Sequence, residues 1–169
     1  MGRLQSKLDR TFPEKNYTIT NHGVYGFKSS DVLQQMLKPE VAQDIKNADM
    51  FIVYIGTNDL LKSNGGDLYP LHHEKLVEAK DIYEDKLNGI LETLETANSD
   101  APVILLGLYN PYQDGDQIEK YIDHWNNSIR KKQRKIKISP TFLPMNYSRE
   151  KTRNSTSLIP FIRTERDMR

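Results

Sequence analysis

The sequence predicts an α/β domain in which helices pack against a parallel β-sheet. The first sign is an uninterrupted apolar run, Met50–Ile55, which is typical of a strand buried on both faces. A second run of the same kind spans residues 102–108. Between the two runs, from His73 to Ala97, apolar residues recur every three or four positions, as on one face of a long amphipathic helix. A strand, a helix and a strand in this order favour a parallel connection.

The remaining elements extend the same alternation. Residues 17–20 predict a short strand, and the residues from Val32 to Ile45 have helical spacing that Pro39 interrupts. Residues 118–129 predict a further helix, with Tyr121, Ile122 and Trp125 on one side. We therefore expect three layers, with helices on both faces of the sheet.

Composition places few limits on function. A length of 169 residues suits one domain, and the absence of cysteine excludes disulfides and thiol chemistry. No apolar run approaches the length of a transmembrane helix, and no signal peptide is visible in the chain. As written, the chain would stay in the cytoplasm, but its location remains open.

The charge is divided unevenly along the chain. Residues 1–129 hold 12 Lys/Arg and 20 Asp/Glu, whereas residues 130–169 hold 12 Lys/Arg and only 3 Asp/Glu. We therefore divide the chain into a domain, 1–129, and a basic tail, 130–169. The basic run from Lys131 to Lys137 offers an alternative function, a non-catalytic domain whose tail binds nucleic acid or acidic lipid. A solvated, disordered tail without a specific nucleic-acid partner is the favoured interpretation.

Two polar loops follow predicted strands, Asn21–Gly23 and Gly56–Asp59. In parallel sheets, ligands bind beyond the carboxyl ends of the strands, where both loops are expected to lie. Each loop also has a purely structural interpretation. Gly23 could simply end a strand, and Asn58 with Asp59 could cap the next helix.

Taken together, these loops resemble two sequence blocks of the SGNH/GDSL-type hydrolases. Gly56-Thr57-Asn58-Asp59 is similar to the G-x-N-D block of that family, and Asn21-His22-Gly23 is similar to the preceding block, which supplies a glycine. The resemblance covers roughly residues 1–129. It implies a three-layer α/β/α, flavodoxin-like fold with five parallel strands in the order 2-1-3-4-5, and hydrolysis of carboxylic esters.

The resemblance also implies roles for four residues. The Gly23 N–H and the Asn58 carboxamide would form an oxyanion hole, while Gly56 and Asp59 would support the turn. Cleavage of an ester by serine passes through a tetrahedral oxyanion, which preorganised donors stabilise. The expected partner is a small acyl ester, and neither a cofactor nor a metal is needed.

The residues that carry out the attack are not found in this sequence. There is no G-D-S block with a nucleophilic serine and no D-x-x-H block with a catalytic histidine. Asp123 and His124 are adjacent and do not fit that spacing, and helix capping explains Ser29 and Ser30 better than nucleophilic attack does. We interpret the chain as an incomplete, inactive fragment truncated at its N-terminus. Loss of the first strand would leave a gap between the second and third strands.

The tail suggests a hypothesis about the reading frame. A shifted frame across Leu158–Arg169 permits D-x-F-H-P-N-x-x-G-Y-E, which contains D-x-x-H and is similar to the last block of the family. We therefore hypothesise a frameshift between about Ile129 and Thr141. The coding DNA tests this hypothesis, since codons that spell something else in the shifted frame would end it.

Overall fold

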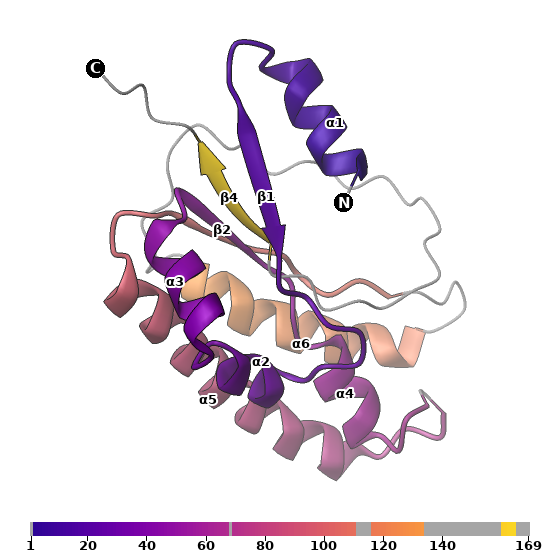
Figure 1. Cartoon of the computed structure of the whole chain (residues 1–169). Helices are drawn as coiled ribbons and strands as arrows, with labels where there is room; N and C mark the ends of the chain where they lie inside the picture. Colours follow the sequence, from indigo (N-terminus) through magenta and orange to yellow (C-terminus); the bar gives the residue numbers. More distant parts are fainter. Residues whose placement is uncertain (1, 68, 111–115, 134–159, 165–169) are drawn as a thin grey trace.

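The computed structural model of the chain describes residues 2–67, 69–110, 116–133 and 160–164 (Figure 1). Helices and strands alternate along these residues, as the sequence predicts. The elements are α1 (Gly2–Thr11), β1 (Tyr17–Asn21), α2 (Ser29–Gln35), α3 (Pro39–Asn47), β2 (Met50–Val53), α4 (Thr57–Ser63), α5 (His73–Ala97), β3 (Val103–Leu105), α6 (Asp116–Gln133) and β4 (Pro160–Thr164).

The strands form one sheet in the order β1-β4-β2-β3. β2 and β3 are parallel, and Phe51 pairs with Val103. β4 is antiparallel to both of its neighbours, so β1 and β2 run in the same direction. The carboxyl ends of β1, β2 and β3 therefore meet at one edge of the sheet, as the alternation of strands and helices predicts.

β4 fills the place where the sequence predicts a gap. It lies between β1 and β2, where Ile162 pairs with Ile19 on one side and with Met50 on the other. The expectation of two unpaired strand edges was therefore wrong. An open edge exposes N–H and C=O groups that a strand of either direction can pair, and Pro160–Thr164 is rich in residue types that favour strands.

Two parts of the predicted tail, residues 130–133 and 160–164, are described by the structure, and both have regular secondary structure. α6 continues through Ile129 to Gln133, so this helix crosses the boundary that we placed between residues 129 and 130. Residues 160–164 form β4 rather than a disordered segment. The site of the hypothetical frameshift lies mostly outside the described residues, as do the basic residues beyond Gln133 and the end of the chain beyond Thr164.

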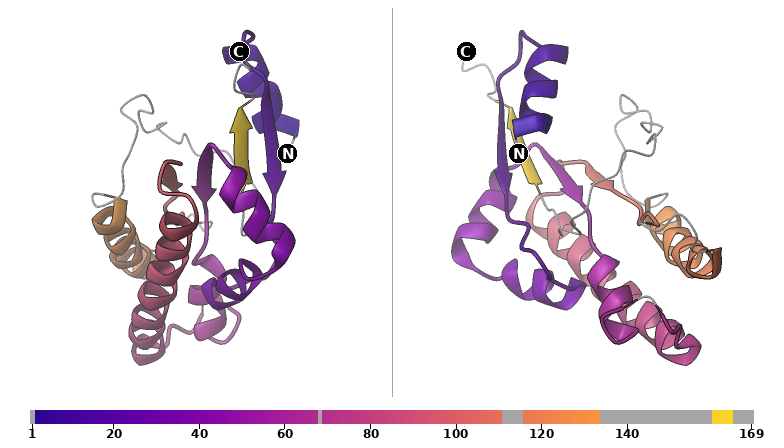
Figure 2. Two further views of the ribbon diagram at one scale, coloured as in Figure 1. Left: turned by 60° about the vertical axis from the view of Figure 1, so that its left-hand side comes forward. Right: turned by 90° about the vertical axis from the view of Figure 1, so that its right-hand side faces the viewer.

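α5 lies at the centre of the packing. It contacts α2, α3, α4 and α6, whereas α1 lies against β1, away from these helices (Figure 2). The predicted apolar face of α5 is confirmed: Leu76, Tyr83, Leu87, Ile90 and Leu94 are all buried. They join one core cluster with residues of β2 and α6. Within the described ranges, no helix is both long and apolar enough to cross a membrane.

Candidate functional site at the carboxyl edge of the sheet

The loop after β1 is fixed by three hydrogen bonds near its start. The Gly23 N–H donates to Asn21 Oδ1 at 2.9 Å, which closes a local side-chain turn. The Gln35 side chain donates to the His22 carbonyl at 2.9 Å, and His22 Nε2 lies 2.9 Å from Asp44 Oδ2. The predicted donor, the Gly23 N–H, is thus engaged with a neighbouring side chain.

The turn after β2 needs a glycine. Gly56 has φ of +121°, a conformation that side chains of L-residues rarely adopt. A Cβ atom at this position would lie 2.9 Å from Cε2 of Tyr83, which is closer than real contacts allow. The predicted supporting role of Gly56 therefore has a steric basis, because only glycine lets the chain turn here against the tyrosine ring.

Side chains of α4 tie this turn to the loop after β1. Asn58 Nδ2 donates to the Phe27 carbonyl at 2.9 Å, and Lys62 Nζ donates to the Gly26 carbonyl at 2.7 Å. Asn58 and Lys62 are four residues apart and so lie on one face of the helix. α4 therefore holds the loop along a full helical turn.

Asp59 forms buried hydrogen bonds that also connect α4 to α2. Its carboxylate accepts the Ser29 N–H at 3.0 Å and also the Ser29 hydroxyl, and both residues are buried. Burial raises the pKa of the Asp59 carboxyl above its usual value, and the hydrogen bonds from Ser29 offset this only in part. Asp59 thus joins the first turn of α4 to the start of α2 through a buried acceptor.

Neither Asn58 nor Asp59 is the N-cap residue of α4. Gly56 is the N-cap residue of α4, and both side chains bond to the segment before or within α2 instead. Asn58 is 8% exposed, so its carboxamide lies in a largely water-free setting. A carboxamide nitrogen carries two hydrogens, and the bond to Phe27 uses one of them.

Gly26 is a residue that our sequence interpretation missed. It has φ of +80°, a value that favours glycine, while its carbonyl accepts Lys62. The sequence feature that could have pointed to Gly26 is its place three positions after Gly23, in the same loop. The Asn58 side chain is thus bonded to the Phe27 carbonyl near the end of the loop after β1, whereas Gly23 lies near the start of that loop.

Two histidines at the start of α5, His72 and His73, have structural partners. His73 Nδ1 lies 2.8 Å from the Tyr121 hydroxyl, and the His72 N–H donates to Asn64 Oδ1 at 2.8 Å. In the parts of the chain that the structure describes, no three His, Cys, Asp or Glu side chains are grouped so as to hold a metal ion.

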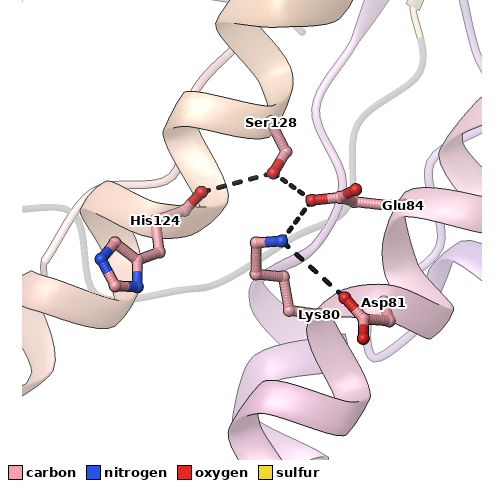
Figure 3. Close-up of polar contacts among 5 residues, drawn as sticks. All are labelled: Lys80, Asp81, Glu84, His124 and Ser128. Atoms are coloured by element: carbon pink, nitrogen blue, oxygen red, sulfur yellow. Dashed lines mark hydrogen bonds and ion pairs between the residues drawn. The ribbon is translucent and has the colours of Figure 1, made fainter.

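A second polar cluster joins α5 to α6 (Figure 3). The Ser128 hydroxyl and Lys80 Nζ both donate to the Glu84 carboxylate. Partial burial raises the pKa of Glu84, but these two hydrogen bonds and the positive charges of Lys80 and Lys132 together outweigh it, so the pKa lies below its usual value. The His124 ring points away from Ser128, and only its backbone carbonyl contacts the hydroxyl, at 3.3 Å. The cluster therefore links two helices and does not form a serine–histidine pair.

Comparison with known proteins decides the family. The model of the GDSL-like lipase/acylhydrolase family matches residues 1–152. The chain belongs to this family. The predicted resemblance is thereby confirmed, and the match extends beyond residue 129, where the motifs that we identified end.

Two curated relatives are similar to this chain. The uncharacterized protein YpmR of Bacillus subtilis (strain 168) is 27% identical over 141 residues, which are 81% of this chain and 55% of that protein. The spore germination lipase LipC of Bacillus licheniformis is 26% identical over 111 residues, 62% of this chain and 51% of that protein. The chain therefore spans about half the length of these curated relatives.

A solved structure supports the fold. The crystal structure of the lipase Lip_vut3 from a goat rumen metagenome matches with a TM-score of 0.56 and 23% sequence identity. The match covers 67% of this chain and 54% of that one. Together with the family match, it establishes the SGNH-type α/β fold that the sequence predicted.

The steric requirement at Gly56 can be tested by substitution. Because both glycines have positive φ, Gly56→Ala and Gly65→Ala should each lower the free energy of unfolding by about 1–2 kcal/mol. Overpacking against Tyr83 should add about 1–3 kcal/mol for Gly56→Ala alone. Gly65, with φ of +97° and no described atom within 4 Å of an added Cβ, is the matched control. Urea unfolding measures both losses, and equal losses would contradict the contact with Tyr83.

The buried carboxyl of Asp59 should make stability depend on pH. Since its pKa is raised in the folded state, its stabilising contribution is complete below its ordinary value of 3.8 and is lost as pH rises through the folded value. The wild type should therefore lose stability relative to Asp59→Asn, which keeps an acceptor for Ser29, as pH rises from 3.8 to neutrality. Urea unfolding of both proteins across this range measures the difference. A difference that stays constant, or grows in favour of the wild type, argues against this assignment.

Proposed function

We propose that this chain provides the oxyanion-hole part of an enzyme that hydrolyses carboxylic acyl esters. The single observation that carries the proposal is the Asn58 carboxamide, buried in the first turn of α4 and oriented by the Phe27 carbonyl at 2.9 Å. Its second hydrogen is available to stabilise negative charge on a substrate oxygen. In a site with little water, one such donor contributes on the order of 3 kcal/mol to transition-state stabilisation.

The second donor is a backbone N–H from the loop after β1. Gly23, the predicted residue, would have to exchange Asn21 Oδ1 for the substrate oxygen, since its N–H is bonded there. Gly26 is the alternative, because its carbonyl accepts a hydrogen bond from Lys62, which lies on the same face of α4 as Asn58. An NMR titration with diethyl phosphate distinguishes the two glycines, because only the donor's amide signal should shift.

The mechanism that follows is the acyl transfer of a serine hydrolase. A serine attacks the acyl carbon, a histidine takes its proton, an aspartate orients the histidine, and the donors of this chain hold the oxyanion. The first three groups are not provided by a G-D-S or D-x-x-H block in these 169 residues. We therefore propose that the chain alone has little esterase activity. Short acyl esters, lysophospholipids and acetylated sugars are the substrate classes that fit.

The oxyanion role can be tested without turnover. Diethyl phosphate, a tetrahedral monoanion, should shift the NMR signals of the Asn58 side-chain amide and of one loop glycine with a common Kd. Because hydrogen bonds to charged groups are strong, Asn58→Ala should weaken binding at least about tenfold. Asn98→Ala is the matched control, since that carboxamide donates to the Ala48 carbonyl before β2, at the opposite edge of the sheet.

The outcomes separate the alternatives. If the amide signal of Gly23 shifts, Gly23 is the second donor, as predicted. If the amide signal of Gly26 shifts instead, Gly26 is the second donor. If diethyl phosphate moves neither glycine, or binds Asn58→Ala as well as the wild type, the oxyanion assignment fails. Turnover of p-nitrophenyl acetate that Asn58→Ala abolishes would contradict the proposed lack of activity.

A further inference from the structure

We infer that Tyr83 is a positioning residue for the oxyanion hole: it fixes the backbone turn from which the Asn58 donor projects. The inference rests on the proposed function and extends it to α5, a helix that contributes no donor to the site.

Tyr83 contacts the turn after β2 at two consecutive residues, Ile55 and Gly56. Its hydroxyl donates to the Ile55 carbonyl at 3.2 Å, immediately before Gly56. Its ring covers Gly56 itself, because an added Cβ would lie 2.9 Å from Cε2 and 3.0 Å from Cζ. One side chain thus contacts two consecutive residues of the turn, by a hydrogen bond and by direct packing.

The turn needs such support from outside. Because glycine adopts positive and negative φ about equally, the φ of +121° at Gly56 is set by the surroundings and not by the residue itself. Gly56 is also the N-cap residue of α4 and has no side chain with which to cap that helix. Since Asn58 follows two residues later, a small rotation at Gly56 would move its carboxamide. Oxyanion donors must be placed to within about half an ångström.

Tyr83 is itself held in place by Trp125 of α6. The two rings are stacked, with centroids 4.7 Å apart and an interplanar angle of 20°. Tyr83 is 1% exposed and Trp125 is 0% exposed, so neither ring has room to turn. Burial raises the pKa of the Tyr83 hydroxyl, and the negative charges of Asp59 and Glu84 raise it further, so the hydroxyl keeps its proton and remains a donor.

The ordinary alternative is that Tyr83 merely fills the core. A residue that acts only through packing would change the stability of the fold without changing the affinity of the site. A positioning residue would change both, and loss of its hydroxyl alone would be enough to weaken binding. The two roles therefore differ in ligand affinity at equal folding.

The test compares two tyrosine variants in the diethyl phosphate titration. Tyr83→Phe keeps the ring and removes the bond to Ile55, and Tyr121→Phe is the control because its hydroxyl contacts His73 instead of the turn. Loss of one net hydrogen bond at the turn should raise the Kd about three- to tenfold for Tyr83→Phe. The Kd of Tyr121→Phe should equal that of the wild type.

A second variant removes the packing of Trp125 against the Tyr83 ring. Trp125→Leu abolishes the stack but keeps the Tyr83 hydroxyl, and it too should raise the Kd. Fluorescence of Trp125, the only tryptophan of the chain, verifies folding in both tyrosine variants, and urea unfolding does so for Trp125→Leu.

The results overturn different claims. If Tyr83→Phe and Trp125→Leu lose stability but bind diethyl phosphate like the wild type, the positioning role is wrong and the proposed function stands. If the wild type does not bind at Asn58, the proposed function fails and the inference fails with it.

Discussion

The hydrogen bond from the Asn58 side chain to the Phe27 carbonyl is the interaction on which the account depends. It orients a buried carboxamide and fastens the loop after β1 to the turn after β2. Next to it, the Asp59 carboxylate bonds to Ser29 and anchors the same helix turn to α2. The adjacent residues Asn58 and Asp59 therefore both connect α4 to the segment that precedes and begins α2.

The sheet explains how these two loops come to face each other. β1 and β2 run in the same direction on either side of β4, so their carboxyl ends open at one edge. α5 then supports the β2 turn from below through Tyr83, which bonds to the Ile55 carbonyl. The geometry of the site thus depends on core packing as much as on the loop residues themselves.

Much of the fold could be predicted from periodicity, and α5 is the best case. Its apolar spacing fixed both the helix and its buried face over His73–Ala97, because a long helix repeats its pattern many times. β4 could not be predicted, since pairing between distant segments leaves no local pattern. At the site, Gly56 and Asn58 followed from the resemblance. The engagement of Gly23 by Asn21 and the contact of Tyr83 with Gly56 depend on side-chain packing that the sequence does not encode locally.

The most direct test is a measurement of scalar coupling across the hydrogen bond between the Asn58 side-chain amide and the Phe27 carbonyl carbon. NMR detects such a coupling only when the donor hydrogen and the carbonyl share a bond. We expect a measurable coupling, together with slow hydrogen exchange of that amide, because Asn58 is 8% exposed. Absence of the coupling, with exchange as fast as for an exposed asparagine, would contradict it, since Asn58 would then not be oriented toward the site.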